Sequence, residues 1–143
     1  MGELGDKLIE IFSPKQREVW LIEDKEIRLN PNNREDKYRR PALVVSAKEL
    51  LNNKDFPLVN IIPLSRQGKP DKLSFPVASG YEECTDDFKP DSSSLAVLPY
   101  YQPIEKKFFK QRCGTIDEIT YNAIVNLLCS EVVGCEDFDL NVE

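Results

Sequence analysis

The chain has 143 residues, of which 41% are hydrophobic and 31% charged, and its formal net charge is −6. This length and composition predict one globular domain with a sizeable core. The sequence contains no histidine, which excludes ordinary Ser-His and Cys-His nucleophile pairs. Because no apolar run could span a bilayer and the acidic N-terminus is unlike a secretory signal, we expect a cytoplasmic protein with no membrane partner.

The sequence predicts six short strands, most of which are marked by apolar runs. A short amphipathic helix is expected before them, at residues 3–12, and a helical turn at residues 48–53. The long polar segment 24–37 is predicted to be a loop of the kind that is usually functional. The predicted strands cover residues 17–23, 41–47, 57–64, 73–79, 95–98 and 110–114.

The last predicted element is a helix that begins at Thr115. Thr115 and Glu118 have the form of a capping box, and Gly134 is suited to end the helix. An acidic tail follows at residues 135–143. Short strands followed by one helix predict a mainly β (α+β) fold, a small β-barrel closed by a C-terminal helix. The apolar stripe of this helix is predicted to consist of Ile116, Ile119, Ala123, Leu127, Leu128 and Val132.

The negative charge is concentrated in two segments. Residues 82–91 carry a net charge of −4 and residues 131–143 carry −5, which leaves +3 on the rest of the chain. The overall charge argues against a nucleic-acid partner. The mildly basic remainder, with its cations at residues 28–40 and 106–112, keeps such a partner possible.

The four cysteines do not predict a metal site. None of them forms a C-x-x-C pair, and a zinc site would need all four thiolates from scattered positions. Reduced thiols are typical of cytosolic proteins. We therefore expect reduced cysteines and no metal. The cysteines are Cys84, Cys113, Cys129 and Cys135.

Residues 38–47 form the most informative stretch of the chain. Arg39 and Arg40 precede Pro41, which begins a continuous apolar and β-branched run. Proline fits the first position of a strand because it has no N–H to give to the ladder. The pattern predicts that two guanidinium groups are held at the rim of a β-sheet.

One reaction fits a chain without histidine, a phosphate loop or metal-ligand spacing: RNA cleavage by the RNA's own 2′-hydroxyl. The substrate supplies the nucleophile, so the protein has to align the 2′-oxygen with the scissile phosphate. It also has to stabilise charge on the phosphate oxygens, which suits a bidentate guanidinium. On position alone, however, Arg40 could equally be a surface cation beside a strand.

Several motifs occur in a recognisable order within residues 17–134. They are Trp20-Leu21-Ile22, Arg40-Pro41-Ala42-Leu43-Val44-Val45-Ser46, Ile61-Ile62-Pro63-Leu64-Ser65, Leu95-Ala96-Val97-Leu98 leading to Gln102, and Gly114-Thr115-Ile116. In order and spacing they resemble the MazF/PemK family, whose members are mRNA endoribonuclease toxins of bacterial toxin–antitoxin pairs. The resemblance implies an SH3-like barrel, a homodimer with a single-stranded RNA groove across it, and a cognate antitoxin, with no cofactor. It makes residues 1–143 a single MazF/PemK-like domain, with a helical extension at residues 1–14.

The resemblance implies catalytic roles for Arg40 and Ser65. Arg40 matches the family's arginine before the proline, and Ser65 stands where the family usually has threonine, so the hydroxyl is kept and the methyl is lost. Because arginine stays protonated at neutral pH, we expect Arg40 to stabilise the phosphate rather than act as a base. The candidate RNA-binding residues are Arg39, Pro41, Arg66, Tyr101, Gln102, Lys106 and Lys107.

The chain departs from the family pattern at three places. Tyr101 replaces an acidic residue before Gln102, Pro99 falls where one branch has a catalytic arginine, and the loop at residues 24–39 is longer than is typical. The alternative function is that of a non-catalytic SH3-like barrel relative, acting as a protein-binding module or a gyrase-type toxin. In that case Ser65 is a turn residue and the lysines are a solvated face.

Overall fold

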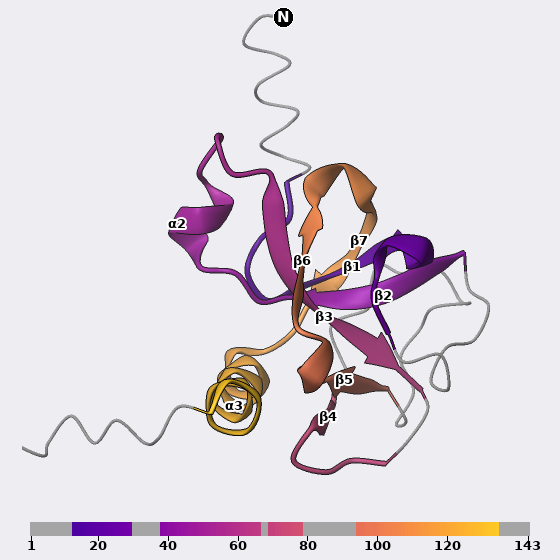
Figure 1. Ribbon diagram of the computed structural model, residues 1–143, viewed down its shortest axis with the longest axis vertical. Helices are drawn as coiled ribbons and strands as arrows, with labels where there is room; N and C mark the ends of the chain where they lie inside the picture. Colours follow the sequence, from indigo (N-terminus) through magenta and orange to yellow (C-terminus); the bar gives the residue numbers. More distant parts are fainter. Residues whose placement is uncertain (1–12, 30–37, 67–68, 79–93, 135–143) are drawn as a thin grey trace, which may run out of the picture.

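The computed structural model describes residues 13–29, 38–66, 69–78 and 94–134. They form a seven-stranded antiparallel sheet, a short helix α2 (Lys48–Leu51) and a C-terminal helix α3 (Glu118–Leu127), as Figure 1 shows. Mainly β structure with a C-terminal helix is thus confirmed. The strands are β1 (Glu18–Glu23), β2 (Arg39–Val44), β3 (Leu58–Ser65), β4 (Ser74–Pro76), β5 (Leu95–Val97), β6 (Gln102–Glu105) and β7 (Phe109–Thr115).

The strand order is β4-β5-β3-β2-β1-β7, and β6 also pairs with β3. One edge of β3 is shared, because Leu58 to Ile61 pair with β6 whereas Leu64 and Ser65 pair with β5. The other edge of β3 pairs with β2. In the part of the chain that the structure describes, no pairing joins the outer strands β4 and β7, so closure into an SH3-like barrel stays a prediction.

Strand β2 begins two residues earlier than predicted, so that Pro41 lies inside the strand and not at its start. Pro41 lies opposite Leu21 of β1, and the pairing of β2 with β3 begins only at Ala42. The proline therefore occupies a position where β2 has a neighbour on one side only. A missing N–H is tolerated there for the same reason that it is tolerated on an edge strand.

The sheet buries apolar side chains on both faces, which follows from the alternation of side chains along each strand. On β1, Val19 and Leu21 join a cluster that contains Ile124 and other side chains of α3. Trp20 and Ile22 join a second cluster, which contains Leu51 of α2. Each fully buried Leu or Ile contributes about 1.5–3 kcal/mol. This two-sided burial explains the nearly continuous apolar runs in the sequence.

Helix α3 begins later than the predicted capping box. Asp117 is its N-cap and accepts a hydrogen bond from the Thr120 backbone N–H at 2.9 Å, whereas Thr115 remains in β7. The predicted stripe is therefore wrong at Ile119, which is 84% exposed. The helix continues into a π-helical turn, η6 (Leu128–Val133), and ends as predicted at Gly134, whose φ is +82°.

Strand β6 was not predicted as a separate element. The 3₁₀ turn η4 (Leu98–Tyr100), with a proline in its first turn, separates the strand predicted at residues 95–98 from β6. A proline pre-sets the backbone dihedral of such a turn. The predicted helix at 3–12, the extension at 1–14, the acidic segment 82–91 and the tail 135–143 lie wholly or mostly outside the described residues.

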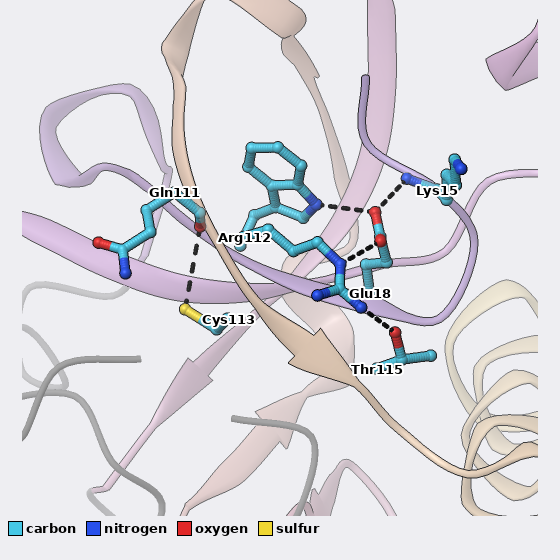
Figure 2. Close-up of polar contacts among 7 residues, drawn as sticks. Lys15, Glu18, Gln111, Arg112, Cys113 and Thr115 are labelled. Carbon is cyan, nitrogen blue, oxygen red and sulfur yellow. Dashed lines mark hydrogen bonds and ion pairs between the residues drawn. The ribbon is translucent and has the colours of Figure 1, made fainter. Parts of the chain in front are cut away.

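Cys113 is fully buried and disulfide-bonded, whereas Cys129 is a free, exposed thiol. The expectation of four reduced thiols is therefore wrong, because spacing in the sequence does not reveal which cysteines meet in space. The Cys113 sulfur lies 3.9 Å from the Gln111 carbonyl oxygen (Figure 2). This is a packing contact, because a disulfide sulfur carries no hydrogen. None of the described helices is long and apolar enough to cross a membrane.

Candidate functional site

The guanidinium of Arg40 is buried, not presented at the rim of the sheet as the sequence suggested. Its side chain is only 1% exposed. Nε donates to Oδ1 of Asp24 at 2.8 Å, and Nη1 donates to the Leu64 carbonyl oxygen at 3.2 Å. Nη2 is buried and has no hydrogen-bond partner among the described residues. The arginine is thus fixed by two contacts and keeps one donor group unused.

Asp24 was not predicted as a site residue, although the sheet register explains its role. It is the first residue of the 3₁₀ turn η1 (Asp24–Glu26), which directly follows β1. Strand β1 pairs with β2 up to Glu23 and Arg39, so the next residue, Asp24, lies near the start of β2. Its backbone N–H donates to the Tyr38 carbonyl at 3.1 Å. The available sequence signal was an acidic residue directly after the first predicted strand, together with an arginine just before the second.

Ser65 ends β3 and is 3% exposed. It directly follows Leu64, whose carbonyl oxygen accepts from Arg40. The structure therefore brings Arg40 and Ser65, which are far apart in the sequence, to the same part of the sheet. Arg66 is exposed immediately after the strand. This group of neighbouring residues, Asp24, Arg40, Leu64 and Ser65, is called the arginine site below.

Arg39 and Pro41 flank Arg40 but differ in exposure. Pro41 is buried, so direct contact with a ligand would require it to become accessible. Arg39 is partly exposed, with its guanidinium 5.5 Å from the centre of the Tyr38 ring. The Tyr38 ring is itself 80% exposed. Arg39 and Tyr38 are thus the accessible cationic and aromatic groups of this segment.

Gln102 uses its amide to hold the backbone of another segment. Its Oε1 accepts from the Arg28 N–H at 2.8 Å, and its Nε2 donates to the carbonyls of Arg28 and Tyr100 at 2.9 and 2.8 Å. Both amide hydrogens are therefore engaged. Neighbouring Tyr101 is about one-third exposed, and burial, with a smaller effect of the Cys129 thiol, raises its pKa.

The predicted lysines lie at the opposite end of β3 from Ser65. The Lys106 backbone N–H donates to the Pro57 carbonyl, just before β3 begins. The length of β3 corresponds to about 23 Å at the usual strand rise. Lys107 pairs with Glu105 at 3.3 Å and lies 5.1 Å from the centre of the Phe108 ring. The predicted RNA-binding residues are therefore spread along β3. The lysine group (Lys106 and Lys107) lies at one end, Arg66 follows the other end, and Gln102 pairs opposite Ile61 between them.

A surface pocket of about 290 Å³ lies beside the lysine group. Its walls come from Glu26 of η1, from Arg28 shortly after that turn, and from Leu58 at the start of β3. Strand β6 and the 3₁₀ turn η5 (Lys106–Phe108) complete the walls. It contains apolar side chains, two glutamates and Arg28. No three acidic or cysteine side chains in the described ranges are grouped so that they could hold a metal ion.

A second ion pair, between Glu18 of β1 and Arg112 of β7, is visible in Figure 2. Glu18 is 6% exposed and also accepts from the Trp20 indole N–H at 3.0 Å and the Lys15 backbone N–H at 2.7 Å. Arg112 Nη2 donates to the Thr115 hydroxyl at 2.8 Å. Each charged group therefore has several partners, which is typical of a structural network.

Comparisons with known proteins give a consistent result. Over residues 15–131 the chain matches the family described as PemK-like, MazF-like toxin of type II toxin–antitoxin system. No curated protein sequence matches the chain significantly.

Solved structures with similar folds include the toxin MazF-mt6 of Mycobacterium tuberculosis, with a TM-score of 0.62, 11% identity, and coverage of 84% of this chain and 99% of that one. A MazE–MazF structure from Deinococcus radiodurans gives a TM-score of 0.60, 13% identity, and coverage of 87% and 98%. An endoribonuclease in complex with its cognate antitoxin, from a mycobacterial species, gives a TM-score of 0.56 and 12% identity. The match covers 87% of this chain and 96% of that one. At these identities the structures establish a shared fold.

Proposed function

Because the chain belongs to the PemK-like, MazF-like toxin family of type II toxin–antitoxin systems, we propose that it is a toxin that cuts single-stranded RNA without metal. The 2′-oxygen of the RNA loses its proton to water and attacks the adjacent phosphorus, the bond from phosphorus to the 5′-oxygen breaks, and the 5′-oxygen takes up a proton from water. The products are a 2′,3′-cyclic phosphate and a 5′-hydroxyl. The observation that carries this proposal is the buried Nη2 group of Arg40, which has no partner among the described residues.

In this proposal the arginine site stabilises the charge of the reacting phosphate. Nη2 of Arg40 donates to a non-bridging phosphate oxygen, and the Ser65 hydroxyl donates to the same group. Asp24 and the Leu64 carbonyl fix the guanidinium plane through Nε and Nη1. Donors that are oriented before the substrate arrives need little reorganisation in the transition state. Asp24 is a positioning residue here, because it acts through Arg40.

The burial of Arg40 has a consequence for substrate entry. A side chain that is 1% exposed has to become accessible before it can meet a phosphate. RNA binding is therefore expected to move the groups that bury the Arg40 side chain. The same burial favours the second candidate, a non-catalytic relative that binds a protein partner, because an arginine that stays buried would serve stability alone.

The proposed partners follow from the family and from the complexes named above. We expect a cognate antitoxin, because an endoribonuclease and its antitoxin form one of the similar structures. We also expect a homodimer and action in the cytoplasm, where the RNA substrate is found, although a buried disulfide is unusual there. The proposed RNA contacts are Arg39, Arg66, Tyr101, Lys106 and Lys107, with Pro41 and Gln102 holding the backbone near them.

The test is cleavage of a long unstructured RNA in EDTA, followed by sequencing of the ends. Wild type should give discrete 5′-hydroxyl ends. Arg40→Ala should give none, and Arg40→Lys should lose about 10²–10³-fold in rate, because lysine keeps the charge but lacks the second oriented donor. Lys48→Ala, an exposed change on α2, is the control. Intact RNA with wild type, or equal cutting by Arg40→Ala, would reject the proposed enzyme.

A further inference from the structure

The pocket beside β6 has two kinds of wall. Its apolar surface comes from Leu58, Ile104 and the ring of Phe108, and its polar surface includes Glu26, Glu105 and Arg28. Its volume of about 290 Å³ is at the lower end of the range for small-molecule sites. A single flat ring therefore suits it better than a longer stretch of chain.

The polar groups of the pocket favour a ligand that donates hydrogen bonds. Ionised carboxylates only accept, so Glu26 and Glu105 offer the pocket acceptors for N–H groups, although Glu105 also pairs with Lys107. Adenine, cytosine and guanine each carry an exocyclic amine, and carboxylates recognise the amine of cytosine in this way. Uracil has no exocyclic amine, and its one base-edge donor, the N3–H, lies between two carbonyl oxygens that the carboxylates would repel. Arg28 supplies a cation for the phosphate attached to such a base.

The pocket is held in shape by contacts that are independent of any ligand. Gln102 binds both the N–H and the carbonyl of Arg28, at 2.8 and 2.9 Å. The segment that carries Glu26 and Arg28 is thereby fixed against β6. A site of this kind is organised in advance, which lowers the entropic cost of binding.

The pocket also has a defined relation to the arginine site. Glu26 and Asp24 are the two ends of the 3₁₀ turn η1, and such a turn rises about 2 Å per residue. One end of the pocket therefore lies within about one turn of the carboxylate that holds Arg40. A base in the pocket would belong to a nucleotide close to the one that is cut.

We propose that this pocket selects the base at one position near the cleavage site, accepting adenine, cytosine or guanine and excluding uracil. The inference rests on the proposed function, since it assigns a specificity subsite to the same reaction. Glu26 and Glu105 are the specificity-determining residues, and Phe108 supplies a stacking surface.

The test compares wild type with Glu26→Gln, Glu105→Gln and the double variant on two randomised pools. The first pool is single-stranded RNA, whose cut ends are sequenced. The second is 2′-O-methyl RNA, which binds but cannot be cut because its 2′-oxygen is blocked. Glu49→Gln, an exposed change on α2, is the matched control. Glutamine keeps the size of glutamate but offers both a donor and an acceptor, so it removes the bias against uracil.

Wild type and the control should exclude uracil about tenfold or more at one position near the cut, and the double variant should reduce this to about twofold or less. Unchanged cleavage profiles in the double variant would overturn the inference and leave the nuclease standing. Base discrimination in the uncut pool without any cleavage would support the pocket and reject the nuclease. If the double variant keeps the wild-type cleavage profile but binds the antitoxin more weakly, the pocket binds a cationic peptide. That result would also overturn the inference.

Discussion

Two carboxylate–arginine pairs stand at the two ends of β1, and they differ in how completely they are satisfied. Glu18, at the start of the strand, binds Arg112 of β7, and Asp24, just after its end, binds Arg40 of β2. Both carboxylates are buried. Each pair joins a buried carboxylate to an arginine of a neighbouring strand, so the difference in role has to come from their remaining partners.

The Glu18 pair is a closed network. Its carboxylate also accepts hydrogen bonds from the Trp20 indole N–H and the Lys15 backbone N–H. Arg112 donates a further hydrogen bond to the Thr115 hydroxyl. The Asp24 pair is open, because Nη2 of Arg40 is buried without a partner among the described residues. A buried donor without a partner costs about 1–3 kcal/mol. The closed pair therefore fits a structural role, whereas the open one fits a group that is available to a ligand.

The largest effect is expected from breaking the open pair with Asp24→Asn. The variant leaves the charge of Arg40 buried and uncompensated, so the free energy of unfolding should fall by about 3 kcal/mol. The rate constant of single-turnover cleavage, measured on folded protein, should fall about tenfold, because the guanidinium is less firmly oriented. Substrate affinity should change little. A lower stability with an unchanged cleavage rate would mean that Asp24 does not position Arg40.

A smaller effect, of a different kind, is expected from Glu18→Gln in the closed pair. The variant loses a charge-assisted hydrogen bond to Arg112, so stability in urea should fall by about 2 kcal/mol. Cleavage by the folded fraction should stay at the wild-type rate, because this network does not touch the arginine site. A cleavage defect as large as that of Asp24→Asn would abolish the distinction between the two pairs.

The strands of the fold were predictable because their signal is local. Apolar runs marked β1, β2, β3 and β5, and the glycine that ends the C-terminal helix was identified correctly. The misplaced helix start had a tertiary cause. Thr115 pairs opposite Glu18 in the sheet, and Arg112 engages its hydroxyl, so it is not available to cap the helix. Sequence periodicity carries no information about such a competition.

The candidate site was predictable only in part. The motifs pointed to Arg40 and Ser65, and pairing across β3 brings both of them beside Leu64. Asp24 was missed because it lay in a polar segment that was treated as a loop, although the register of β1 with β2 determines its place. The burial of Arg40 could not be predicted, since exposure depends on packing from several elements at once.

Asp117 is an exposed carboxylate that accepts no hydrogen bond from an arginine within the described residues, so it is the weak counterpart of the two buried pairs. Its hydrogen bonds from the Thr120 hydroxyl and backbone N–H lower its pKa below the ordinary value of 3.8. A lowered pKa means that the folded state favours the charged form, so this contribution to stability is complete above pH 3.8 and disappears as pH falls through the folded-state pKa. Thermal melts should therefore show a small stability margin of wild type over Asp117→Asn near pH 6, and a reduced margin near pH 2.5. A margin that does not depend on pH would show that the cap acts through its geometry and not through its charge.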